Sequence, residues 1–383
     1  MIASLYIHIP FCSSLCDYCD FYSIDINSIK ENNLKNEYFD SYLKALVLDI
    51  REQIEYFKIE EIPTAYIGGG TPSVLDSKIK YLLNELNKIS CFNPVEFTIE
   101  ANTESVANDF LDICKDGGIN RISLGVQTFN EKSRLAVNRG RSEHREEKKV
   151  KKSLKIASSY FPDSLCVDLI TGLPFQDNAA VFNDINKILE FNPSHISLYS
   201  LTVDPETPLA KKINLNTILL PQNEIAEELW LTGRELLITK GFENYEISNF
   251  AKDNKYSRHN LRYWRLENWI GAGAAASGTI INDSIPQGKR YAYNSNIDEY
   301  IKNPNIQNAN CEILDKLTLI KESLLMGYRC SDGPDLTLFK NRFSCSIEEC
   351  IGETLFRWQN KNKMLYLNRF LEEAFVELER RMI

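Results

Sequence analysis

Six short apolar segments alternate with longer segments of helical periodicity through the first two-thirds of this chain, and this order constrains its fold more than any other feature. The strand candidates are residues 4–9, 65–67, 96–100, 121–125, 165–170 and 195–200. The helix candidates between them are residues 37–57, 78–89, 105–115, 131–137 with 146–159, and 179–190. Such an order is typical of parallel strands joined by right-handed crossovers. It predicts the α/β class and an open, partial (β/α)6 barrel.

The alternation of strands and helices stops after about residue 290. Residues 222–239, before that point, are an amphipathic helix candidate. Beyond it we expect helices at 295–302, 314–328, 350–359 and 368–381, the last capped by Asn368, and a short strand at 364–367. We therefore expect two domains. Residues 1–289 form the barrel with its extension, and residues 290–383 form a small, mostly helical domain, for which the winged-helix type is one candidate form.

The composition is that of an ordinary globular protein and narrows the classes of partner. Of the 383 residues, 43% are hydrophobic and 25% are charged. The net charge of −9 gives no reason to expect nucleic acid as a partner. The basic segment 139–155 also carries glutamates and is interpreted as a solvated helix face. No signal-peptide pattern and no membrane-spanning apolar run is evident, so we expect a cytoplasmic protein with reduced thiols; peripheral membrane contact stays open.

Three cysteines follow the first strand candidate in a Cys-x3-Cys-x2-Cys pattern: Cys12, Cys16 and Cys19. A [4Fe–4S] cluster is usually held by four thiolates. Three thiols therefore leave one iron open to a substrate or cofactor. The alternative is structural zinc, but such sites usually need four ligands, often in paired Cys-x2-Cys units. The remaining cysteines lie scattered at 91, 114, 166, 311, 330, 345 and 350. The pattern favours an open-site cluster over zinc and over a disulfide framework.

A glycine run follows the second strand candidate, in Ile67-Gly68-Gly69-Gly70-Thr71-Pro72. Consecutive glycines allow unusual φ angles and let a ligand approach the backbone. The run matches neither the dinucleotide fingerprint nor a Walker A sequence. A tight turn and a ligand contact are both open interpretations.

Polar residues stand at the ends of the later strand candidates. They are Glu100, Gln127, Arg139 and Asp168. In barrels of parallel strands the carboxyl ends of the strands meet around one site, so these side chains should share a cavity with the cysteines. The carboxylates could hold ribose hydroxyls or an amino group, and Arg139 could hold a carboxylate. A structural ion-pair network is the alternative.

The segment His259-Asn260-Leu261-Arg262-Tyr263-Trp264 joins a potential metal ligand to two aromatic residues and an arginine. Imidazole is a common axial ligand of haem iron. The alternative is a packed loop over the barrel.

Together these motifs resemble the radical S-adenosylmethionine (SAM) superfamily, and more narrowly its oxygen-independent coproporphyrinogen III oxidase-like group. The resemblance rests on Tyr6-x-His8-x-Pro10-Phe11-Cys12, Gly68-Gly69-Gly70-Thr71-Pro72-Ser73, Glu100-Ala-Asn102, Gly125-Val-Gln127-Thr-Phe129-Asn130, Asp168-Leu-Ile-Thr-Gly172-Leu-Pro174 and His195-Ile-Ser-Leu-Tyr199. The stretch from Tyr245 to Ala251, with the His259 segment, is similar to the HemW branch, the haem chaperones.

This resemblance implies three cofactors: a [4Fe–4S] cluster, SAM bound at its open iron, and haem. It implies that Cys12, Cys16 and Cys19 bind the cluster and that His259 belongs to haem binding. The residues implied for the SAM pocket are Tyr6, Tyr18, Gly69, Gly70, Thr71, Glu100, Gln127, Arg139 and Asp168.

Phe21 separates the two branches of the group. The oxidases carry a further cysteine at this position and the haem chaperones lack it, so the resemblance favours haem delivery to acceptor apoproteins. The alternative is oxidative decarboxylation of coproporphyrinogen III, with an electron donor such as flavodoxin or ferredoxin. Whether the protein is an enzyme stays open between these two functions. Ser277 replaces a histidine usual in the family, which weakens whatever contact that histidine makes with SAM or tetrapyrrole. That departure also leaves a radical enzyme on another substrate as a third hypothesis.

Overall fold

The computed structural model describes residues 1–29, 32–139 and 147–382. Of the basic segment, Arg141 and Arg145 lie outside the described residues. Residues 147–155 of the segment belong to α5 (Glu147–Tyr160), whose buried residues are Val150, Ser153, Leu154 and Ala157. Its lysines at 148, 149, 152 and 155 are exposed, as expected for a solvated helix face.

The six predicted strands form one parallel sheet. They are β1 (Ser4–Ile9), β4 (Ile62–Gly69), β5 (Phe92–Asn102), β6 (Arg121–Gln127), β7 (Leu165–Thr171) and β8 (His195–Ser200), neighbours in this order. Every pair of neighbours among them is parallel. The strands are largely buried on both faces, which explains their nearly continuous apolar sequences. The predicted partial barrel is confirmed.

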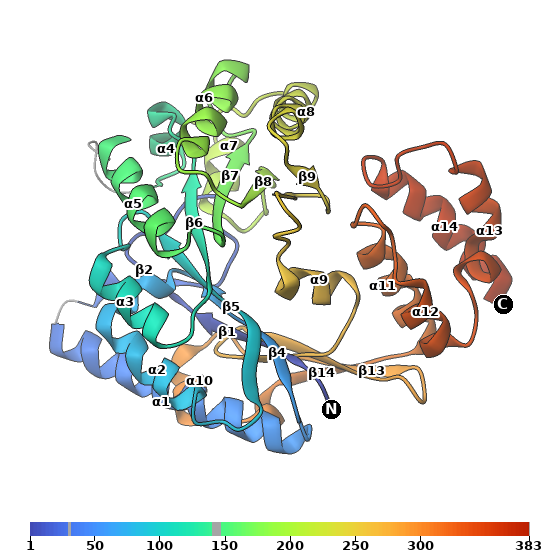
Figure 1. Ribbon diagram of the computed structural model, residues 1–383, viewed down its shortest axis with the longest axis horizontal. Helices are drawn as coiled ribbons and strands as arrows, with labels where there is room; N and C mark the ends of the chain where they lie inside the picture. The colour runs from blue at the N-terminus through green and yellow to red at the C-terminus, as the bar shows by residue number, and fades with distance from the viewer. Residues whose placement is uncertain (30–31, 140–146, 383) are drawn as a thin grey trace.

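Helices cover the outer face of this curved sheet, as Figure 1 shows. They are α1 (Asn32–Tyr56), α2 (Ile79–Leu86), α3 (Asn108–Asp116), α4 (Glu131–Ala136), α5, α6 (Asn178–Leu189) and α8 (Asn223–Thr239). Helix α7 (Pro208–Asn214) was not predicted, although its first turn has a clear signal: Pro208 follows Thr207, whose side chain accepts a hydrogen bond from the Ala210 amide.

Short strands extend the sheet at both edges, to twelve strands in all. Beside β1 lie β11 (Trp269–Ala272), β12 (Ser277–Asn282), β13 (Gln287–Ala292) and β14 (Asn310–Leu314); beside β8 lie β10 (Asn249–Ala251) and β9 (Glu243–Asn244). The remaining short elements are β2 (Phe11–Cys12), β3 (Ile24–Asp25), η1 (Ile26–Ser28), η2 (Pro72–Lys78), α9 (Arg258–Trp264), α10 (Ile297–Lys302) and η3 (Ile306–Asn308). Most of the edge strands are antiparallel and mix polar with apolar residues. Their sequences contain no continuous apolar run from which a strand could be predicted.

A separate helical region ends the chain and stands to the right of the barrel in Figure 1. It consists of α11 (Lys316–Gly327), α12 (Leu336–Phe343), α13 (Ile347–Arg357) and α14 (Leu367–Met382). Its buried residues, among them Phe343, Trp358 and Phe370, form their own hydrophobic cluster. The expected division after residue 289 falls inside β13, whose partner β14 still belongs to the sheet. The two-domain division with that boundary stays a proposal.

Two details of the helical region differ from expectation. Residues 364–366 form a turn and Leu367 begins α14, so no strand forms here; Asn368 lies inside α14 and does not cap it. The physical reason is that Met364 and Leu367 are buried against the helical core at helical spacing, while Asn362 accepts a hydrogen bond from the Leu365 amide at 3.0 Å. No helix within the described ranges is long and apolar enough to cross a membrane.

Candidate cofactor site at the mouth of the barrel

A cavity of about 540 Å³ opens at the carboxyl ends of the parallel strands. It gathers most of the site residues predicted from the sequence: Cys12, Cys16, Tyr18, Cys19, Gly69, Gly70, Thr71, Glu100, Gln127, Arg139 and Asp168. These residues come from segments up to about half the chain apart. The prediction that the strand ends share one cavity with the cysteines is therefore confirmed, while the role of each residue stays a proposal.

The three cysteines lie on a loop that is tied to the rest of the barrel. Cys12 ends β2, and Cys12 and Cys16 are each 9% exposed. Between them and Cys19, Asp17 donates its amide to Val137 O at 2.9 Å and accepts the Leu209 amide at 2.8 Å. Backbone contacts to two distant segments thus hold the loop over the cavity.

Burial raises the pKa of the Cys19 thiol to about 12 and also raises that of Cys12. Such thiols ionise only when a metal replaces the proton. Among the described residues, no three His, Cys, Asp or Glu side chains are close enough to hold a single metal ion.

Backbone hydrogen bonds connect the glycine run to the segment that leads into the cysteine loop. The Gly70 amide donates to Ile9 O at 2.9 Å, and the Thr71 amide donates to Phe11 O at 2.8 Å. A Cβ atom on Gly70 would lie 2.8 Å from Phe11 O, and Gly69 has a φ of +110°. Only glycine fits both positions without strain. The run is therefore a tight turn that also exposes backbone to the cavity.

Arg139 joins three parts of the cavity wall. Its Nη2 atom donates to Asn102 Oδ1 and to Gly125 O, each at 2.8 Å, and its Nη1 atom lies 3.5 Å from Cys16 Sγ. Asn102 also donates to Thr71 Oγ1 at 2.9 Å, so it links the arginine to the glycine turn. Asn102 was missed as a site residue. The signal for it was its spacing of two from Glu100 on one strand, which places both on the same face.

Two carboxyl groups of the cavity, those of Glu100 and Asp168, are held by hydroxyl and amide donors. Tyr66 Oη donates to Glu100 Oε1 at 2.7 Å and the Gly69 amide donates to Glu100 Oε2 at 3.0 Å. Ser123 Oγ donates to Asp168 at 3.0 Å. Burial raises the pKa of Glu100 to about 7, and burial also raises that of Asp168. A cationic ligand would favour the ionised form of both groups.

Gln127 provides a direct test of whether a ligand fits the cavity. Its backbone has a φ of +67°, which is strained for a residue with a side chain, and the strand bulges beside it. Its Oε1 atom is buried and, within the described part of the chain, accepts no hydrogen bond. Buried polar atoms are nearly always paired. A ligand that donates a hydrogen bond in the cavity would satisfy it.

Tyr6 and His259 are not among the residues that line the cavity. Tyr6 Oη lies 3.0 Å from His8 Nδ1, and the Tyr6 ring stacks on Tyr66. His259 is 1% exposed. Its Nδ1 lies 2.9 Å from Thr64 Oγ1 and its Nε2 lies 2.8 Å from Tyr263 Oη. Both rings stack on Tyr66, whose hydroxyl donates to the cavity-lining Glu100.

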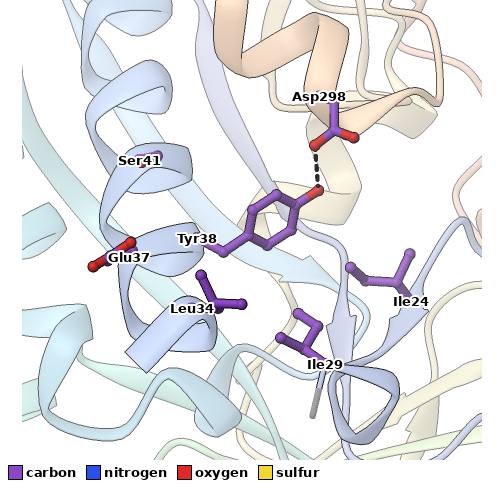
Figure 2. Close-up of a pocket in the computed structure, with 7 residues that line it drawn as sticks. All are labelled: Ile24, Ile29, Leu34, Glu37, Tyr38, Ser41 and Asp298. Carbon is purple, nitrogen blue, oxygen red and sulfur yellow. Dashed lines mark hydrogen bonds between the residues drawn. The ribbon is translucent and has the colours of Figure 1, made fainter. Parts of the chain in front are cut away.

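A second cavity of about 430 Å³ lies outside the barrel mouth, between α1 and the start of α10. Figure 2 shows its centre, where Tyr38 Oη donates to Asp298 Oδ1 at 3.0 Å. Its lining is apolar and acidic and includes neither cysteine nor histidine. The three cysteine thiols that could hold a cluster line the first cavity and not this one.

Comparison with known proteins agrees with this geometry. Residues 6–188 match the model of the Radical SAM superfamily. The chain is 33% identical to a Lactococcus lactis protein named "Heme chaperone HemW", over 96% of this chain and 91% of the relative. It is 35% identical to the Escherichia coli protein of the same name, over 75% of this chain and 71% of the relative. In fold it is similar to the E. coli coproporphyrinogen III oxidase HemN, with a TM-score of 0.76 at 21% identity, covering 98% of this chain and 89% of that one.

Proposed function

From the premise that this chain belongs to the HemW family of haem chaperones, within the radical SAM superfamily, we propose that it binds haem and a SAM-ligated [4Fe–4S] cluster and passes the haem to acceptor proteins. The observation that carries the proposal is identity of 33% over nearly the whole length of a curated haem chaperone. Likeness to the oxidase HemN, at 21% identity, concerns the fold alone.

The cavity residues divide naturally between the two cofactors of the barrel. Cys12, Cys16 and Cys19 would hold the cluster, which when bound supplies an open iron for the amino and carboxylate groups of SAM. The residues that would surround SAM are Tyr18, Gly69, Gly70, Thr71, Glu100, Gln127, Arg139 and Asp168, with Tyr6 behind them. The unpaired Gln127 oxygen and the two protonatable carboxyls suit a cationic ligand with hydrogen-bond donors.

The affinity for SAM should depend on pH through Glu100. Because the pKa of this carboxyl is raised to about 7, it is mostly protonated at pH 6, and a cationic ligand must displace that proton to bind. We expect SAM to bind roughly tenfold more weakly at pH 6 than at pH 8, as calorimetry on the cluster-loaded protein would measure. Glu100→Gln should bind SAM more weakly at pH 8 and lose most of this dependence. An equally steep pH dependence in the variant would exclude Glu100 as its source.

Haem ligation by His259 stays a prediction of the resemblance, and a purely structural role is the alternative. Both ring nitrogens are hydrogen bonded, and Glu96 Oε1 accepts the His259 amide at 2.8 Å. Ligation through either nitrogen would require the contact of that nitrogen to break. If His259 ligates haem, His259→Ala should abolish saturable haem binding; a structural role alone predicts a lower thermal unfolding midpoint with haem affinity within about threefold of wild type, since a buried hydrogen-bonded group is lost. A loss of haem binding without a change in that midpoint would identify His259 as the ligand.

The alternative function is oxidation of coproporphyrinogen III, and the two are separated by an anaerobic assay. The reconstituted protein is supplied with reductant, SAM and coproporphyrinogen III, and the products are resolved by chromatography. We expect no protoporphyrinogen beyond one equivalent per chain. Catalytic accumulation would overturn haem delivery as the sole function. Phe21, which stands two residues after Cys19 and lines the cavity, leaves no thiol at the position where the oxidases carry one.

The finer assignments complete the proposal. We place the protein in the cytoplasm, with haem-accepting apoproteins as its partners and a flavodoxin or ferredoxin as electron donor, and we propose no nucleic-acid partner. Peripheral contact with a membrane would bring it to membrane-bound acceptors. The haem and oxidase assays come first. The identity of the acceptor and any catalytic cleavage of SAM are then tested separately.

A further inference from the structure

Two thiols meet at the corner between α12 and α13, and neither lines the cofactor cavity. This corner belongs to the helical region beside the barrel (Figure 1). Cys345 Sγ and Cys350 Sγ are 3.6 Å apart, and neither cysteine is in a disulfide. Cys345 is half-buried, while Cys350 is only 5% exposed. Sequence analysis left both residues without a role.

The start of α13 explains why these two side chains touch. Ser346 caps the helix, and Glu349 Oε2 accepts a hydrogen bond from the Ser346 amide at 2.6 Å, which completes a capping box. Residues just before the cap and at the fourth helical position then face each other, a contact that apolar side chains usually make. In this chain those positions hold Cys345 and Cys350, so the same geometry brings two thiols together.

We propose that Cys345 and Cys350 are a redox modification site, a dithiol that low-molecular-weight disulfides convert reversibly to an intramolecular disulfide. The pair needs only a small approach of the two sulfur atoms, because the capping box already fixes the backbone between them. The site lies outside the cofactor cavity and does not depend on the proposed haem function.

The exchange proceeds in two balanced steps. The thiolate of Cys345, the more accessible residue, attacks one sulfur of an oxidised-glutathione-type disulfide and releases one glutathione thiolate. Cys350 then loses its proton and attacks the Cys345 sulfur of the mixed disulfide, releasing the second glutathione. The two protein thiols lose two electrons, which reduce the glutathione disulfide, and the two protons pass to the released thiolates. Burial raises the pKa of Cys350 to about 12, which keeps this thiol protonated and leaves the first attack to Cys345. The short contact between the two sulfur atoms, 3.6 Å, favours the second, intramolecular step.

The disulfide would stiffen a helix start that is otherwise interrupted. Ile351, directly after Cys350, has a non-helical φ of −140°. The carboxylate of Glu377 on α14 accepts the amides of Glu353 at 2.9 Å and Thr354 at 2.6 Å, beyond this interruption. The first turn of α13 is therefore held by its capping box and the cysteine contact, and oxidation would replace that contact with a covalent bond.

The test uses the full chain with its cluster reconstituted under anaerobic conditions. The holoprotein is equilibrated with glutathione buffers, and free thiols are trapped with N-ethylmaleimide. The mass of the proteolytic peptide that contains both cysteines is then measured by mass spectrometry. We expect a disulfide, lighter than the dithiol by two hydrogen atoms. Its fraction should rise from about a tenth to nine-tenths over roughly a 100-fold increase in the ratio of oxidised glutathione to the square of reduced glutathione. Dithiothreitol should reverse it.

Variants give the matched controls. Cys345→Ala, at the half-buried position, should abolish the disulfide while leaving the circular dichroism spectrum unchanged. Cys311→Ser, which removes an exposed thiol on β14, should leave the disulfide unaffected. The wild-type measurement stands even if a Cys350 variant fails to fold. The proposal is overturned if both wild-type thiols remain alkylated or only glutathionylated at every ratio, or if a metal ion protects them without loss of mass.

Discussion

Replacing Cys16 with serine should remove the [4Fe–4S] cluster almost completely. Cys16 lies in the middle of the three-cysteine loop, 9% exposed and 3.5 Å from the Arg139 guanidinium. With only three thiols available, no spare ligand remains, and a serine hydroxyl is a poor substitute for a thiolate on iron. We expect iron after anaerobic reconstitution to fall from about four atoms per chain to fewer than about one, with matching loss of sulfide and of visible absorbance.

The matched control for this prediction is Cys311→Ser. Cys311 is exposed on β14, far along the chain from the cavity. It should reconstitute as wild type does. Full iron and sulfide content in the Cys16 variant, with an unchanged absorbance spectrum, would show that this residue is not a ligand and would reopen the assignment of the loop.

Replacing Arg139 with methionine should weaken SAM binding strongly while the cluster is retained. The guanidinium donates to Asn102 and Gly125 and is the cationic group that lines the cavity, where a carboxylate would sit opposite it. Losing a buried charged donor costs about 2–3 kcal/mol, or roughly 30- to 150-fold in the dissociation constant of SAM. Calorimetry at matched cluster content would measure it.

Arg139→Lys separates charge from geometry at the same position. Lysine keeps the positive charge but lacks the planar fork that reaches two acceptors at once. We expect an intermediate loss, roughly tenfold, because one of the two contacts survives. If both variants bind SAM as tightly as wild type, the arginine supports the cavity wall and does not contact the ligand.

The sequence was most informative where local pattern and tertiary structure agree. The strands at 4–9 and 195–200 have the predicted bounds, because short segments rich in apolar residues between helical patterns are typical of buried strands. The edge strands β9 to β14 could not be predicted in this way. They are short, partly polar and paired with distant segments, so only the tertiary structure determines them. Residues 364–367 show the opposite error: a strand was predicted there, but the segment leads into a helix. A short apolar run is compatible with either a strand or a helix start.

The candidate site follows the same division. Sequence patterns located the cysteines, the glycine run and the polar residues, because each of them stands at or after the end of a predicted strand. The positive φ of Gln127 and its unpaired oxygen could not be found, because both depend on a bulge between β6 and β7. The contact of His259 with Thr64 was also hidden, since Thr64 lies on β4 while His259 and Tyr263 share α9.

The most direct test of haem delivery is a visible titration of the cluster-loaded protein with haem, followed by addition of an apoprotein that binds haem. The proposal predicts saturation near one haem per chain, a shifted Soret band, and transfer of that haem to the apoprotein. Absence of saturable binding, or haem that stays bound when the apoprotein is added, would contradict it.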